Sequence, residues 1–118
     1  MRYMISILTD DDARRQWEAD GAVFDDAHRA VARELHESGE LVDANELDQE
    51  GAMVIGTYRG EPITTRGPFT EGTEIVGGYY IVDVRDLDRA VEIAGRLAEA
   101  RYSPVEIRRL KHGAEILP

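Results

Sequence analysis

The order in which strand-like and helix-like hydrophobic patterns follow one another limits this chain to few folds. A mostly apolar run at residues 3–8 predicts a buried strand, and a helical stretch follows it. Several strand-like runs come next, then a second helical stretch, then a closing strand at residues 105–108. This order is typical of an α+β domain with a split βαβ arrangement and an added β-hairpin in the middle. We expect one domain over residues 1–118.

The first helical stretch carries its own start and stop signals. Thr9-Asp10-Asp11-Asp12 offers an N-cap and places acids in the first turn, where the helix dipole favours them. Gly21 predicts a weak point, and Gly39 is the expected C-cap. Trp17 is assigned to a separate first turn, where it is either a packing residue at the helix end or a lid over a pocket. The residues expected to face the core recur at helical spacing: Phe24, Ala27, Val31 and Leu35.

The middle of the chain reads as a series of strands. Apolar and polar residues alternate over residues 41–47 and 52–58, which predicts two strands, and a short strand is expected near 63–65. Residues 75–84 form the longest strand candidate, and Gly77-Gly78 lies inside it. Such a pair suggests a β-bulge or the close approach of another backbone or ligand, with the glycines leaving room for the ligand.

The second helix has the clearest signal in the chain. Asp86 can cap it, and its apolar residues follow an i, i+3, i+4, i+7 pattern. We therefore expect one stripe to face the core: Leu87, Ala90, Val91, Ala94, Leu97 and Ala98.

Composition excludes several classes of function. The 118 residues carry a net charge of −10, which disfavours binding to nucleic acids or to anionic membrane surfaces. The chain has no cysteine, so disulfides and thiolate metal sites are excluded. No apolar run approaches the ~20 residues of a membrane span, and the opening residues read as a strand and not as a signal peptide. We expect a cytoplasmic protein whose acidic face is solvated or recruits a basic partner.

One string resembles the DGPF signature of YCII-related proteins: Arg66-Gly67-Pro68-Phe69-Thr70-Glu71-Gly72-Thr73-Glu74, followed by Val76-Gly77-Gly78-Tyr79-Tyr80. Three further strings match in the same order: Arg2-Tyr3-Met4, Asp86-Leu87-Asp88-Arg89-Ala90 and Pro104-Val105-Glu106-Ile107-Arg108. The resemblance implies a ferredoxin-like fold whose sheets pair into a dimeric α+β barrel, and hence a homodimer with an interface near residues 75–84.

The chain departs from that signature at two positions. Arg66 stands where the signature has its leading Asp, and Thr73 stands where it has Lys. In related members the leading Asp and a His on the first helix look like an acid/base pair. His28 matches that His by its position on the helix, but its Asp partner is missing here.

His28 is the candidate catalytic residue. It lies four residues after Phe24 and three before Val31, so it falls on the apolar stripe. Histidine titrates near neutral pH and can move protons, but a buried His is also often a core residue satisfied by one hydrogen bond. Both interpretations place the ring between the first helix and the sheet.

Five further residues are candidates for ligand binding. The fork of donors on Arg66 suits a carboxylate or phosphate, or it pairs with Glu71 or Glu74 to brace the loop. Two nearby glutamates can also raise the pKa of one of them. Tyr79 and Tyr80 alternate along a strand, so one ring points inward, to line a pocket or to pack, and one points outward.

Neither a metal nor a cofactor is expected. His36 and His112 do not join His28 in a metal-ligand spacing, and nucleotide-binding fingerprints are missing from the sequence. Two functions therefore compete. One is a small-molecule pocket with acid/base chemistry on a small organic ligand. The other is a non-catalytic regulatory module linked to transcription, since some proteins of this kind look associated with sigma factors.

Overall fold

The structure is a computed structural model that describes residues 1–48, 50–58, 60–66, 75–97, 101 and 104–113, without the side chains of residues 57, 58 and 61–66. Its elements, in chain order, are β1 (Arg2–Thr9), α1 (Asp11–Ala19), α2 (Gly21–Ser38), β2 (Leu41–Glu46), β3 (Met53–Tyr58), β4 (Glu61–Arg66), β5 (Ile75–Asp83), α3 (Leu87–Gly95) and β6 (Val105–Arg109).

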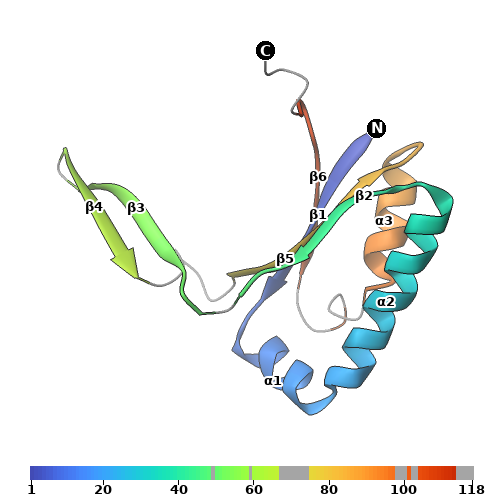
Figure 1. Ribbon diagram of the computed structural model, residues 1–118, viewed down its shortest axis with the longest axis horizontal. Coiled ribbons are helices and arrows are strands. Elements are labelled where there is room, and N and C mark those ends of the chain that lie inside the picture. The colour runs from blue at the N-terminus through green and yellow to red at the C-terminus, as the bar shows by residue number, and fades with distance from the viewer. Residues whose placement is uncertain (49, 59, 67–74, 98–100, 102–103, 114–118) are drawn as a thin grey trace.

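Four strands form one antiparallel sheet in the order β2-β5-β1-β6. The first and last strands of the chain are therefore neighbours, as a split βαβ fold requires. Helices α2 and α3 lie along one side of this sheet, and the β3–β4 hairpin projects from the other side (Figure 1). The α+β prediction is confirmed and the topology is compatible with a ferredoxin-like fold. The pairing of two copies into a barrel stays a prediction.

The core lies between the helices and the inner face of the sheet. Tyr3, Ile5 and Ile7 of β1 alternate onto that face and are buried there. Buried aliphatic residues of α2, of α3 and of the segment just after α3 cover them: Val31, Leu35, Ile93 and Leu97. Burying each large apolar side chain stabilises the fold by roughly 1.5–3 kcal/mol.

The ends of the first two helices agree with the sequence signals. The Asp10 side chain accepts a hydrogen bond from the Ala13 backbone N–H at 2.8 Å and caps α1. The chain breaks at Asp20, next to the expected weak point, so Trp17 belongs to a separate helix. Gly39 ends α2 with a φ of 79°, a left-handed conformation that glycine adopts without strain. No helix within the described ranges is long and apolar enough to cross a bilayer.

The predicted core stripe of α3 is wrong in part. Leu87 and Val91 are 50% and 51% exposed, whereas Ala90 and Ala94 are buried together with Ile93, which the prediction omitted. The helix carries apolar residues on more than one side, so its period alone does not decide which side faces the sheet. The side with Ile93 is the one that packs on β1 and α2, and Ala98 lies outside the described residues.

The bulge expected at Gly77-Gly78 is present. The register of β5 against β1 shifts there, because Ile7 faces Gly78 and Leu8 faces Val76. A Cβ added to Gly78 would lie 3.0 Å from the backbone oxygen of Asn45, and one added to Gly77 would lie 2.9 Å from a methyl group of Thr9. The missing side chains themselves open little space, because neighbouring strands already occupy it, but both glycines line the cavity described below.

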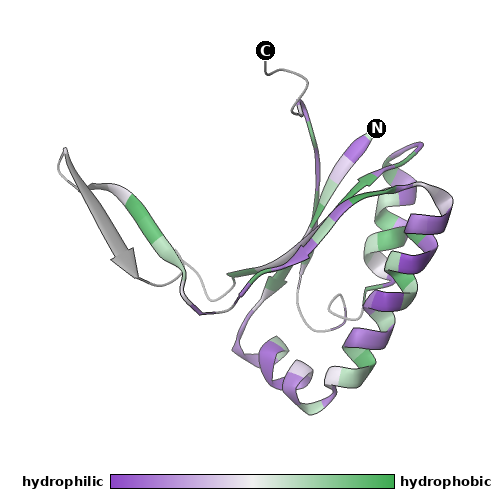
Figure 2. Cartoon of the chain, viewed as in Figure 1, coloured by the Kyte–Doolittle hydropathy of each residue, from purple (hydrophilic) through white to green (hydrophobic). Residues whose placement is uncertain are grey.

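Within the described residues, the β3–β4 hairpin is a separate two-stranded sheet held by its own pairing. Its register runs from Met53 opposite Arg66 to Tyr58 opposite Glu61. The radius of gyration is 16.1 Å, against about 13–14 Å for a compact chain of this length. Met53 and Ile55 are 53% and 78% exposed, and β3 is coloured as apolar in Figure 2. An isolated two-stranded hairpin is at best marginally stable in water.

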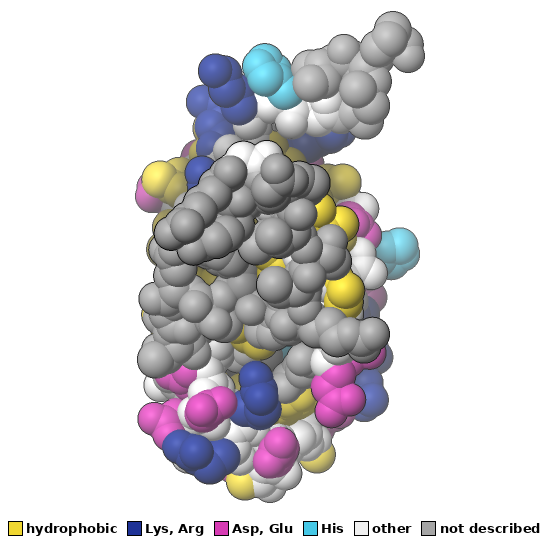
Figure 3. All heavy atoms as spheres, turned by 90° about the vertical axis from the view of Figure 1, so that its left-hand side faces the viewer, with side chains coloured by type: hydrophobic (Ala, Val, Ile, Leu, Met, Phe, Trp, Pro, Cys, Tyr) yellow, Lys and Arg dark blue, Asp and Glu magenta, His cyan; other side chains and the backbone are white. Residues whose placement is uncertain are grey.

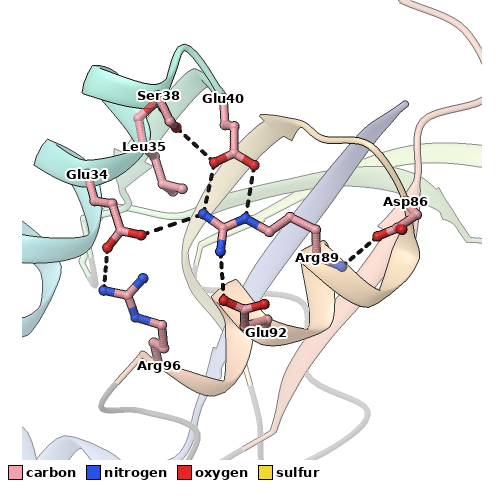
Figure 4. Close-up of polar contacts among 8 residues, drawn as sticks. All are labelled: Glu34, Leu35, Ser38, Glu40, Asp86, Arg89, Glu92 and Arg96. Carbon is pink, nitrogen blue, oxygen red and sulfur yellow. Dashed lines mark hydrogen bonds and ion pairs between the residues drawn. The ribbon is translucent and has the colours of Figure 1, made fainter.

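An ionic network joins α3 to the end of α2 (Figure 4). Arg89 donates from Nε and Nη2 to the two carboxylate oxygens of Glu40, at 3.0 and 2.9 Å, and from Nη1 to Glu92 at 2.8 Å. Glu34 accepts from Arg96 at 2.6 Å, and that bond lowers the pKa of Glu34. The Arg89 hydrogen bonds lower the pKa of Glu40 to about 2, against a burial effect that opposes the shift.

The Arg89–Glu40 pair should stabilise the fold measurably, because its side chains are only 12% and 19% exposed. We expect Arg89→Ala to lower the free energy of unfolding by about 1.5–3 kcal/mol, as for hydrogen bonds to charged groups. The control is Arg15→Ala, which removes the exposed Arg15–Asp12 pair. It should lower the free energy of unfolding by less than about 1 kcal/mol. Equal losses in urea denaturation would contradict this account.

The same pair predicts a pH dependence. Because the folded-state pKa of Glu40 lies below its ordinary value of 4.5, the pair stabilises the protein above that pH and loses its effect as the pH falls toward 2. The difference between the parent and Arg89→Ala should therefore shrink over that interval. If the stability difference between the two proteins stays constant as the pH falls to about 2, Glu40 is not the residue through which Arg89 stabilises the fold.

Gly78 should resist substitution for a steric reason. Gly78→Ala forces a methyl group against the Asn45 carbonyl, and we expect a loss of about 1–3 kcal/mol, as for other overpacked sites. Gly95→Ala on α3 is the matched control, because an added Cβ there meets nothing within 4 Å. It should be neutral or stabilising by up to about 1 kcal/mol. Thermal unfolding of both variants checks this, and an unchanged Gly78→Ala would contradict the packing at the bulge.

Candidate functional site

A cavity of about 380 Å³ lies between α1, the start of α2 and the inner face of the sheet. β1, β2 and β5 form its floor, and the two helices form its walls. This volume is within the usual range for small-molecule sites, about 300–1,000 Å³. The break at Asp20 creates the space, because it lets two short helical faces meet at an angle over one end of the sheet (Figure 1).

Helical spacing brings the wall residues together. Ala13 and Trp17 are four residues apart on α1, and Phe24 and His28 are four apart on α2, so each pair shares one side of its helix. Trp17 is the chain's one tryptophan, and here it lines the cavity wall. The wall combines apolar and aromatic side chains with polar and charged ones, Arg14 and His28 among them, and ligand sites likewise set a few polar groups among apolar ones.

His28 and Tyr80 form a pair at this wall. His28 Nδ1 lies 2.6 Å from the Tyr80 hydroxyl oxygen, and the two rings are nearly parallel, at 10°, with centroids 5.8 Å apart. Tyr80 is buried and His28 is half-buried. The inward position expected for His28 is therefore what the structure has, and Tyr80 is the inward tyrosine.

The pair can exchange a proton. The neutral imidazole accepts from the phenol at Nδ1 in one tautomer and donates to it in the other. Either arrangement fixes the orientation of the ring, which general acid/base chemistry requires. The core interpretation of His28, one satisfying hydrogen bond, also describes this geometry, so the bond alone does not distinguish the two.

Tyr79 points its hydroxyl to the other side of the sheet. That oxygen accepts from Asn45 Nδ2 at 2.8 Å and donates to Asp43 Oδ2 at 3.0 Å, and both partners belong to the neighbouring strand β2. Both tyrosines line the cavity, but Tyr80 turns its ring to His28 whereas the Tyr79 hydroxyl bonds to β2, as the alternation predicted.

The sequence reasoning missed Arg14. This half-buried residue lines the cavity from α1, and its Nε is buried without a hydrogen-bond partner in the described part of the chain. Its spacing of three residues from Trp17 was the available signal, and it is meaningful only once α1 is known to be a separate helix. Asp25, Arg29 and Glu46 also line the cavity but are exposed, so they form its rim.

Three predicted binding residues are not placed by the structure. Glu71 and Glu74 lie outside the described residues, and Arg66 is described only by its backbone, opposite Met53 in the hairpin. Their mutual pairing stays a prediction. His36 and His112 are exposed, and no group of potential metal ligands comes together among the residues that are described.

Charges of both signs surround the lower end of the molecule, over α1 and the start of α2 (Figure 3). Exposed acids such as Asp12 and Asp26 pair with Arg15 and Arg29 on the same helices. The acidic excess of the sequence is thus interleaved with arginine on this face of the molecule, so this face is not a purely acidic one.

Comparisons with known proteins agree with the fold and the sequence signature. The model of the YCII-related domain matches residues 1–112. An uncharacterised protein of Rhizobium meliloti is 32% identical over 106 residues, which cover 87% of this chain and 85% of that protein. This chain therefore belongs to the YCII-related family.

Proposed function

We propose that this protein binds a small organic molecule in the cavity and acts on it by acid/base chemistry centred on His28. The observation that carries the proposal is the His28–Tyr80 hydrogen bond of 2.6 Å at the wall of a cavity of about 380 Å³. A polar pair beside apolar and aromatic side chains such as Ile7 and Phe24 is what ligand sites share. Proton transfer, elimination or isomerisation is the chemistry that such a pair supports without a cofactor.

Tyr80 takes over part of the role of the missing acid. In the family signature an Asp stands at the position of Arg66, and the resemblance pairs it with the helix His. Here the Tyr80 phenol holds His28 in one orientation by its hydrogen bond and by ring stacking. A neutral phenol lacks the negative charge of a carboxylate, so what Tyr80 takes over is the orienting role.

The regulatory alternative needs an extensive acidic surface for a basic partner. The interleaved charges over α1 and α2 do not favour that role on the face seen in Figure 3. A thermal-shift screen distinguishes the two functions, because a ligand bound only to the folded state raises the unfolding midpoint. The screen should contain small aromatic and carbonyl compounds.

Two variants test the His28–Tyr80 pair. We expect His28→Asn to lower any turnover by about 100-fold or more, since general acid/base groups contribute that much. Tyr80→Phe removes only the hydroxyl and should weaken both activity and stability, the latter by about 1 kcal/mol. Tyr3→Phe is the matched control, because Tyr3 is a buried tyrosine on the same face of the sheet outside the cavity. It should retain full activity and ligand response.

Two results would contradict the proposal. One is a folded His28→Asn variant that binds every compound and turns over every substrate as well as the parent does. The other is a screen in which no compound of either class shifts the unfolding midpoint of the parent.

We also propose that the protein is a homodimer formed through the outer face of the sheet. Met4 and Ile81 are paired on that face and half-buried, and no described helix covers it. The hairpin projects from the same side with Met53 and Ile55 exposed, so a second copy would cover both surfaces. Stable interfaces bury about 1,200–2,000 Å² in total, which a sheet face and an arm can supply together.

Sedimentation velocity tests the dimer. We expect a dimer in the parent and a monomer in Ile81→Arg, because a longer, charged side chain beside Met4 would keep the two copies from packing closely there. Val91→Arg is the control, since Val91 is an exposed apolar residue on α3, away from that face. It should remain a dimer. A parent protein that sediments as a monomer at high micromolar concentration would overturn the proposal.

A further inference from the structure

Arg14 is a half-buried arginine that carries one buried donor without a hydrogen-bond partner among the described residues. Its Nε is buried and makes no hydrogen bond within the described residues, and the side chain lines the cavity. Leaving such a donor unsatisfied costs about 1–3 kcal/mol, and more when the group is charged. A stable protein tolerates this cost mainly where a missing partner supplies the acceptor.

Arg14 differs from the nearby arginines because it makes no ion pair along its own helix among the described residues. Arg15 pairs with Asp12 and Arg29 pairs with Asp26, each across three residues of the same helix. Arg14 has Asp11 at the same spacing, but no such ion pair forms between these two described residues. The guanidinium thus gives up the local carboxylate and lines the cavity instead.

The surroundings of Arg14 select the kind of ligand. The exposed rim carries Asp25 and Glu46, whereas Arg29 is already paired with Asp26, so Arg14 is the cation on the inner wall. An Arg Nε–H together with a neighbouring Nη–H matches the two oxygens of a carboxylate. Aromatic side chains beside it, Trp17 and Phe24, suit a flat apolar body.

We propose that Arg14 binds the carboxylate of a small aromatic acid, whose body lies against Trp17 and whose far end approaches the His28–Tyr80 pair. This inference rests on the proposed function, because it names the ligand class of the same cavity. Arg14 is then the specificity-determining residue, and His28 acts on a ligand that Arg14 has oriented.

The test uses Trp17 as the reporter. Since it is the chain's one tryptophan and lines the cavity, its fluorescence responds to a ligand there. The probes are phenylacetate and phenylacetamide, which share a shape and differ in charge. We expect saturable quenching by phenylacetate, with the amide weaker by about tenfold or more, the difference expected of charge-assisted hydrogen bonds.

Three variants separate binding from folding. Arg14→Gln should weaken phenylacetate by about tenfold or more, whereas Arg15→Gln, the adjacent exposed arginine, should leave its affinity unchanged. Arg14→Met, which removes the unsatisfied donor, should unfold at the same temperature as the parent or higher, and should not bind phenylacetate. A role confined to folding would instead lower the unfolding temperature of Arg14→Met.

The outcomes distinguish this inference from the proposed function. If neutral compounds bind in a His28-dependent manner while phenylacetate does not, or if Arg14→Gln binds phenylacetate as the parent does, the Arg14 inference is wrong and the cavity proposal stands. If neither probe nor any screened compound binds, both are wrong.

Discussion

The antiparallel pairing of β1 with β5 is the interaction on which the rest of this structure depends. β1 lies between β5 and β6, and its inner residues Ile5 and Ile7 are the surface on which the helices pack. The bulge at Gly77-Gly78 sits in this pairing and is set by close approach to Thr9 and Asn45. Because a bulge bends and twists its strand, it also shapes the end of the sheet that forms the cavity floor.

The site follows from that floor and from one break in the chain. If residues 11–38 formed a continuous helix, its apolar side would cover the sheet along one line. The break at Asp20 instead produces two helices that line the cavity. Arg14 and Trp17 lie on α1, and Phe24 and His28 lie on α2. Meanwhile, the Arg89 network ties the far end of α2 to α3, so the end of α2 near the cavity is the end without that brace.

Much of the fold could be predicted because local chemistry determines it. Asp10, Gly39 and Asp86 mark helix ends by hydrogen bonds and backbone geometry within a few residues. The side of α3 that faces the core could not be predicted, because apolar residues lie on more than one side of the helix. Contacts with residues distant in the sequence decide which side is buried. The same limit applies to the site. His28 could be found because it falls on the apolar side of its helix. The unpartnered Nε of Arg14 could not, because it depends on how α1 packs against α2 and three strands.

The central claim is that the cavity between α1, α2 and the sheet is where this protein holds its ligand. NMR chemical-shift mapping with a compound that raises the unfolding temperature tests it most directly. The account predicts saturable shifts of the Trp17 indole, the His28 ring and the backbone amides of Gly77 and Gly78, which all line the cavity. Shifts confined to the outer face of the sheet, around Met4 and Ile81, would contradict it.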